Sequence, residues 1–154
     1  MKKKYIIILI IVPLIIAIIY MLIHNQEKFY LNDKYYNNSS FIEIDSNKIQ
    51  RLNNENYLLF TYNNYCTLPI PCEYIFEDFM KKYNISIISI PFKEFKKTKY
   101  YKKVKYAPTV IIIKKGRIIS YLDANSEKDL DKYQSINDFE KWISKYIYLN
   151  KINW

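Results

Sequence analysis

Cys66 and Cys72 are the two cysteines of this 154-residue chain, and two thiols this close in sequence can form a disulfide and be reduced again. Five residues separate them in the sequence CTLPIPC, and such a span can close. Pro71 stands directly before Cys72, a position typical of the first turn of a helix. A thiolate at a helix N-terminus is stabilised by free backbone N–H groups and the helix dipole, which lowers the pKa of such a thiol. The pair is therefore a candidate redox centre.

The same pair also fits a static role. Cysteines of an exported domain commonly form a structural disulfide, which would fix the intervening segment to its helix. No metal site is expected, because two cysteines cannot complete a tetrahedral zinc site and the one histidine, His24, lies far away in the sequence. No cofactor is expected either.

A membrane anchor is predicted at residues 5–23, which are 19 residues without a charge. As a helix this run would be about 28 Å long, close to the hydrocarbon thickness of a bilayer. Three lysines lie before the run, whereas residues 24–28 have no net charge. The positive-inside rule therefore predicts a cytoplasmic N-terminus at residues 1–4 and an extracytoplasmic domain. A cleaved secretory signal is the alternative, although no small-x-small cleavage site follows the run.

The rest of the chain is predicted to be a juxtamembrane linker and one α/β domain. Residues 24–43 are polar, rich in Asn and Tyr, and without periodicity, which is typical of a linker. Residues 44–150 alternate between apolar runs and amphipathic stretches, which predicts strands and helices in turn. The predicted strands are residues 57–62, 85–90, 110–113 and 118–122, and the predicted helices lie within residues 45–54, 71–82, 93–105 and 136–147. Asp45 or Ser46 can cap the first of these helices, and residues 123–134 are predicted to be a polar connection.

These elements predict a four-stranded mixed sheet with helices on both faces. The first two strands are joined by a helical crossover and should be parallel. The last two are joined by a tight turn that holds the only glycine, Gly116, and should form an antiparallel hairpin.

This arrangement resembles the thioredoxin family over residues 45–150. The apolar strand YLLFTY leads into the cysteine pair, Pro108 stands just before the hairpin, and VIIIKKGRIISYLD matches the proline–strand–glycine–strand ending of the family. The resemblance implies that Pro108 is cis and that the backbone of Ala107 pairs with a substrate strand. It implies that Cys66 is the exposed attacking sulfur and Cys72 the resolving one, and it puts Tyr65 where the family has tryptophan. Membrane-tethered thioredoxin-like proteins occur in Gram-positive bacteria, and some are bacteriocin-transport accessory proteins.

The chain departs from the family pattern in two ways. Two residues separate the cysteines in the family, but here five do. The reducing members have a buried acid six positions before the first cysteine, where this chain has Phe60. Without that proton relay an efficient general reductase is not expected. Helix position alone would also allow the reverse order of attack, because Pro71 puts Cys72 in the first turn.

Two functions follow from these features. The first is a membrane-anchored extracytoplasmic thiol–disulfide oxidoreductase, which acts on cysteine-containing exported proteins or exchanges electrons with a membrane redox partner. The alternative is a non-catalytic adaptor of a membrane or peptide-export complex, with Cys66–Cys72 as a structural disulfide.

The net charge of +9 does not indicate a nucleic-acid partner. Only Arg51 and Arg117 are arginines, and proteins that read phosphates or base edges usually rely on arginine. The abundance of Lys, Ile, Asn and Tyr is typical of an AT-rich genome. Residues 93–105 hold seven lysines and one acid, which indicates a solvated face or a surface for anionic headgroups or wall polymers.

Overall fold

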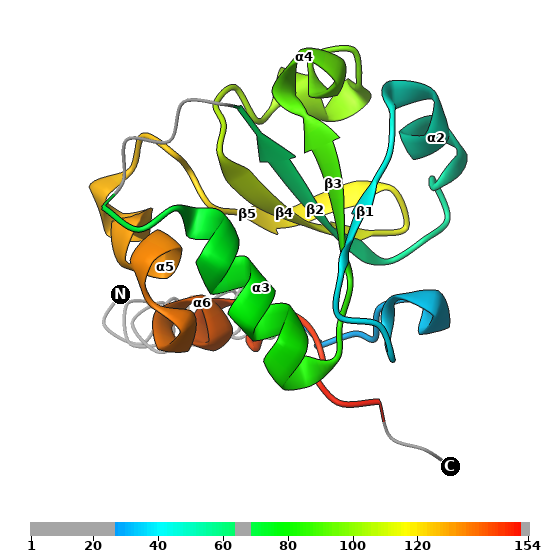
Figure 1. Cartoon of the computed structure of the whole chain (residues 1–154). Helices are drawn as coiled ribbons and strands as arrows, with labels where there is room; N and C mark the ends of the chain where they lie inside the picture. The colour runs from blue at the N-terminus through cyan, green and yellow to red at the C-terminus, as the bar shows by residue number, and fades with distance from the viewer. Residues whose placement is uncertain (1–26, 64–68, 152–154) are drawn as a thin grey trace, which may run out of the picture.

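A computed structural model describes residues 27–63 and 69–151, and within these ranges five strands form one mixed sheet (Figure 1). The strands are β1 Phe41–Glu43, β2 Tyr57–Tyr62, β3 Ile87–Pro91, β4 Thr109–Lys114 and β5 Arg117–Tyr121. Their order in the sheet is β1-β3-β2-β4-β5. β3 is parallel to both β1 and β2, whereas β4 is antiparallel to β2 and to β5.

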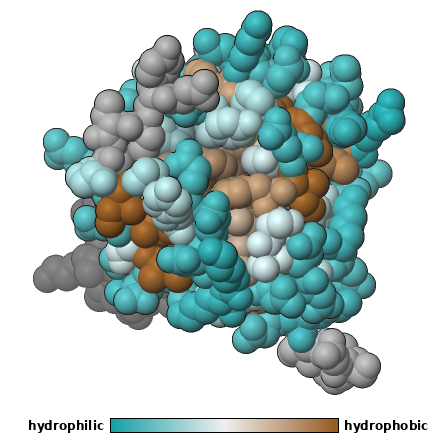
Figure 2. All heavy atoms as spheres, viewed as in Figure 1, coloured by the Kyte–Doolittle hydropathy of each residue, from teal (hydrophilic) through white to brown (hydrophobic). Residues whose placement is uncertain are grey.

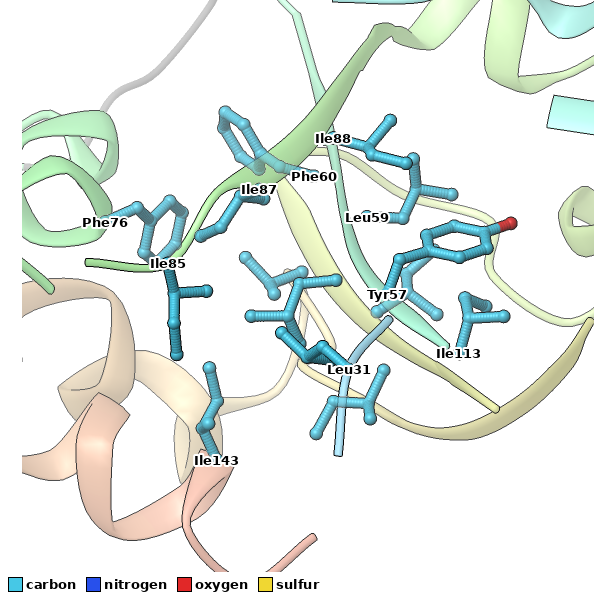
Figure 3. Packing of buried hydrophobic residues seen from close by; sticks show 14 of the residues in the cluster. Leu31, Tyr57, Leu59, Phe60, Phe76, Ile85, Ile87, Ile88, Ile113 and Ile143 are labelled. Carbon is cyan, nitrogen blue, oxygen red and sulfur yellow. The ribbon is translucent and has the colours of Figure 1, made fainter. Parts of the chain in front are cut away.

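The central strands β2 and β4 are apolar along most of their length because both of their faces are covered. Leu59 lies between its register partners Ile88 and Ile111 on one face, and Phe60 points to the other. Figure 3 shows Phe60 and Phe76 on one side of the sheet and Leu59 and Ile88 on the opposite side. The sheet therefore has an apolar layer on each face.

Helices cover both of these layers (Figure 1). One face holds α3 Cys72–Tyr83, α5 Leu130–Gln134 and α6 Ile136–Ile143, and the other holds α2 Ser46–Arg51, α4 Phe92–Phe95 and the 3₁₀ helix η2 Lys99–Lys102. Two further 3₁₀ turns are η1 Asp33–Tyr35 and η3 Glu127–Asp129. The Asp45 side chain accepts from the backbone N–H of Lys48 and starts α2, as its sequence predicts. Ser135 caps α6 in the same way.

The four predicted strands and the predicted hairpin are confirmed, but the predicted sheet lacks one strand. β1 lies inside the stretch taken as a linker, and it pairs with β3 through Phe41–Ile87 and Ile42–Ile88. A three-residue edge strand is too short to produce a recognisable alternation in the sequence. The predicted polar connection at residues 123–134 also contains η3 and α5.

The linker predicted at residues 24–43 is wrong from Phe29 onward, because several apolar side chains of this segment pack into the domain core. Phe29, Leu31, Tyr35 and Tyr36 have at most 7 % of their surface exposed. The Tyr36 hydroxyl donates to the backbone carbonyl of Tyr148, which joins the two ends of the described chain. These residues lie in irregular backbone and in the short helix η1, so their burial leaves no periodic pattern. The domain therefore begins near Phe29 and not at residue 44.

The predicted anchor at residues 5–23 lies outside the described residues. Across residues 27–63 and 69–151 no helix is both long enough and apolar enough to cross a bilayer.

The turn between β4 and β5 depends on Gly116, as the sequence predicts. Its φ is +68°, and Lys115 before it has a φ of +48°. A Cβ at Gly116 would also lie 2.5 Å from the backbone carbonyl oxygen of Asn53. Both the backbone conformation and this close approach require glycine.

Leu31 tests whether the segment before β1 belongs to the core. Leu31→Ala should lower the free energy of unfolding by about 2–5 kcal/mol, since it empties a buried apolar site. Ser39→Ala, at an exposed position of the same segment, should change it by less than about 0.5 kcal/mol. Equilibrium denaturation measures both, and equal small effects would support the linker interpretation.

Candidate functional site

The end of β2 and the start of β4 meet at one end of the sheet. Thr61 and Thr109 are register partners there. Asn63 follows β2 toward the cysteine segment, and its side-chain amide donates to the carbonyl of Ala107 at 3.4 Å. The Ala107–Pro108 peptide bond is cis, as the resemblance implies. Asn63, the last described residue before the cysteine segment, therefore lies beside the cis-proline.

Cys72 is the first residue of α3 and is fully buried. Its sulfur lies 3.7 Å from the Oε2 atom of Glu73, to which the thiol donates. Burial and this carboxylate oppose a negative charge on the sulfur, whereas the free N–H groups of the helix N-terminus favour it. Cys66 and Tyr65 are also predicted at this site, but they lie outside the described residues. The distance between the Cys66 and Cys72 sulfurs is therefore not described either.

Tyr133 of α5 connects the cis-proline to the helices. Its hydroxyl donates to the carbonyl of Pro108 at 2.9 Å and lies 3.3 Å from the carbonyl oxygen of Leu122. Its ring packs near that of Phe76, with a centroid separation of 6.2 Å. Burial raises the pKa of the Tyr133 phenol, and a negative charge on Cys72 would raise that pKa further. Tyr133 is therefore a neutral hydrogen-bond donor between α3, α5 and Pro108.

Sequence reasoning missed Tyr133 because residues 123–134 are mostly polar and were expected to form a connection. The available signal is weak: one aromatic residue within a charged stretch, just before the capping serine of α6. Its role depends on a carbonyl 25 positions away in the sequence, and no local pattern reveals that partner.

Gln134 fixes the loop that leads into α3. Its side-chain amide accepts from the backbone N–H of Ile70 at 3.2 Å and donates to the Ile70 carbonyl at 2.8 Å. Both backbone groups of Ile70 are thus paired, while its side chain remains 44 % exposed. Tyr106, next to the cis bond, and Tyr74, in the first turn of α3, are also exposed. Apolar surface therefore adjoins both Cys72 and Pro108.

The position where the resemblance implies a buried acid is apolar. Phe60 is buried and its ring meets Phe76 edge to face, with centroids 5.1 Å apart. None of the Asp and Glu side chains among the described residues is fully buried, and the carboxylate that contacts the Cys72 sulfur is that of Glu73. Within the same residues, no three His, Cys, Asp or Glu side chains lie close enough together to hold a metal ion.

Removing one hydroxyl tests the bonds of Tyr133. Tyr133→Phe should lower the free energy of unfolding by about 1–3 kcal/mol, because the Pro108 and Leu122 carbonyls lose a buried donor. Tyr74→Phe, at a site 59 % exposed, should change it by less than about 0.5 kcal/mol. Equilibrium unfolding in urea measures both, and a Tyr133→Phe variant as stable as the unmodified chain would contradict these bonds.

Comparisons with known proteins agree with this architecture. No family model matches the sequence, and no curated protein matches it. A thioredoxin from Nicotiana alata superposes with a TM-score of 0.50 and 18 % identity, over 69 % of this chain and 91 % of that one. A thioredoxin from Schistosoma mansoni gives 0.50 and 22 %, over 71 % and 97 %.

These likenesses have too little sequence identity to carry an activity, but they cover nearly the full length of both thioredoxins. They agree with the mixed sheet that has helices on both faces. The chain has the thioredoxin fold.

Proposed function

We propose that this chain is a membrane-anchored thiol–disulfide oxidoreductase of the extracytoplasmic space, acting through Cys66 and Cys72. One observation carries the proposal: Cys72 opens α3 at the end of the sheet that also holds the cis Ala107–Pro108 bond. A cysteine at a helix N-terminus beside an accessible peptide edge is suited to thiol–disulfide exchange with another chain.

The burial of Cys72 favours different roles for the two sulfurs. A protein thiol cannot reach a fully buried sulfur, so Cys66 takes the role of the attacked and attacking atom. In the oxidising direction, a substrate thiolate attacks the Cys66 sulfur and the Cys66–Cys72 bond breaks. Cys72 leaves with the bonding electron pair and takes up a proton. A second substrate thiolate then attacks the mixed disulfide and releases Cys66, so two electrons pass to the protein. The reverse steps reduce a substrate disulfide.

Glu73 is suited to serve as the proton carrier for Cys72. The family acid at position 60 is replaced by Phe60, but the Glu73 carboxylate already contacts the Cys72 sulfur from the helix side. A carboxylate at this distance can take the proton of the Cys72 thiol when that sulfur attacks the mixed disulfide in the reducing direction.

The backbone next to the cis-proline supplies a docking edge for the substrate. Ala107 would pair with an extended segment of the substrate, as an added strand pairs with a sheet edge. The Asn63 amide holds the Ala107 carbonyl at a long 3.4 Å, so an incoming backbone N–H can replace it. The exposed Tyr106 and Ile70 offer apolar contacts on either side.

The anchor at residues 5–23 determines which substrates and partners are available. It places the domain among cysteine-containing exported proteins and within reach of a membrane redox partner. Disulfides persist in that oxidising compartment, whereas cytosolic thiols are kept reduced.

A non-catalytic adaptor of a membrane or peptide-export complex is the second candidate. It is favoured by the five residues between the cysteines and by the apolar Phe60. In this case Cys66–Cys72 is a permanent disulfide, and the function is close to that of bacteriocin-transport accessory proteins.

Single-cysteine variants of the full chain test the proposed roles. Cys72→Ser should accumulate a mixed disulfide with a disulfide-containing unfolded substrate, because the Cys66 thiolate attacks that disulfide and the resolving sulfur is absent, and Cys66→Ser should form none. Non-reducing electrophoresis followed by mass spectrometry detects the adduct.

The reduction potential of the Cys66–Cys72 pair separates the two functions: about −120 to −270 mV fits an exchange catalyst, and a value below about −300 mV fits the adaptor. Activity retained in Cys66→Ser would falsify the catalytic proposal.

Glu73→Gln tests the proton transfer. In the reducing direction it should slow the step in which Cys72 attacks the mixed disulfide by about tenfold or more, because the Cys72 thiol loses its proton acceptor. Glu77→Gln removes a carboxylate one turn further along α3, beside Lys81, and should leave the rate unchanged. Stopped-flow measurement across neutral pH gives both rates. Equal rates in the two variants would remove Glu73 from the mechanism.

A further inference from the structure

The first described residues tie the start of the domain firmly to its core. The backbone N–H of Phe29 donates to the Tyr146 carbonyl and its own carbonyl accepts from the Tyr148 N–H, both at 3.0 Å. The Phe29 ring is buried. Six peptide steps separate Phe29 from Ile23, the end of the predicted anchor, and an extended chain of that length reaches about 20 Å. An anchored domain could therefore not swing far from the bilayer.

The surface around Phe29 carries several cations. The Lys114 Nζ lies 4.9 Å from the centroid of the Phe29 ring. Lys114 and Arg117 line a cavity of about 200 Å³ together with Glu27, Phe29, Ile119 and Tyr146. Lys115 occupies the tip of the same hairpin, next to Gly116.

We define the basic end as Lys28, Lys114, Lys115 and Arg117. Among the described residues, no carboxylate forms an ion pair with any of these four side chains. Glu27 is the acid that shares the cavity with them. The basic end therefore has a positive charge that the domain itself does not neutralise.

We infer that the basic end rests on the anionic headgroups of the bilayer that holds residues 5–23. The inference rests on the membrane anchoring proposed above. Lysines and arginines beside a membrane are attracted to anionic lipids within about a Debye length of the surface, and the short connection keeps these four cations near enough to enter that zone. The occupant of this surface is thus the lipid headgroup layer.

This orientation turns the candidate site away from the membrane. β4 begins at Thr109, beside Pro108, and ends at Lys114 in the basic end. Five strand steps of 3.4 Å separate these ends by about 17 Å. In Figure 1 the first described residues, in blue, lie below the sheet, whereas the arrowhead of β2 points to the upper end. The substrates accordingly are thiols of exported chains in the aqueous space, and not thiols within the bilayer.

Lysine footprinting of the full chain in vesicles tests the orientation. A water-soluble amine-acylating reagent is applied to the chain in phosphatidylcholine vesicles and in vesicles that also contain phosphatidylglycerol, and mass spectrometry gives the rate at each lysine. Lys28 and Lys115 should react about fivefold more slowly in the anionic vesicles, and high salt should remove the difference. Lys103 and Lys105, which line a cavity with Thr109 at the site end, should react equally in both.

A charge-reversal pair supplies the matched comparison. Lys115→Glu/Arg117→Glu should return Lys28 in anionic vesicles to its rate in neutral ones, whereas Lys103→Glu/Lys105→Glu should leave the protection of Lys28 intact. Equal rates at Lys28 in both lipids, or protection of Lys103 and Lys105, would overturn the orientation.

Flotation of the vesicles after alkaline carbonate treatment distinguishes a wrong orientation from a missing membrane anchor. A chain that stays with the vesicles but shows no protection refutes the orientation alone. A chain that is stripped from the vesicles refutes the anchor and the orientation together.

Discussion

The pairing of β2 with β4 is the constraint on which the rest of the structure depends. It places Thr61 opposite Thr109, so the chain leaving β2 and the cis-proline entering β4 must meet at one end of the sheet. The register is well determined because β2 and β4 are buried on both faces, and a slip by one residue would exchange the two sets of side chains. The candidate site is thus a consequence of the most deeply buried part of the core.

Aromatic packing takes the place of buried charge at this end of the sheet. The Phe76 ring contacts Phe60 and Phe139 between the sheet and the helices, and Phe60 stands where the family pattern has an acid. The polar groups near Cys72 lie instead at the boundary of the core, where Glu73 contacts its sulfur and the Tyr133 hydroxyl holds the Pro108 carbonyl. Apolar packing of this kind stabilises the fold without the cost of burying a carboxylate. In the proposed mechanism, proton transfer then depends on a residue of the helix and not on one of the strand.

The early start of the domain changes how an anchored chain would behave. A linker of residues 24–43 would let the domain take any orientation, but Phe29, Leu31 and Tyr36 are part of the core. The β4–β5 hairpin and its cations lie next to the point where the chain enters the domain. The point where the anchor joins the domain and the candidate site would then lie at opposite ends of one sheet.

The sequence by itself determined the elements whose periodicity is strong. The apolar runs of β2, β3 and β4, the cap at Asp45 and the turn at Gly116 all report local preferences, and each is observed where the sequence predicts it. The cis bond at Pro108 came from the family resemblance, and the structure has it. Only the tertiary structure revealed β1, the buried segment from Phe29 to Tyr36, and the roles of Tyr133 and Gln134. The physical reason is the same in each case: these residues are held by partners distant in the sequence, and such partners leave no periodic signal.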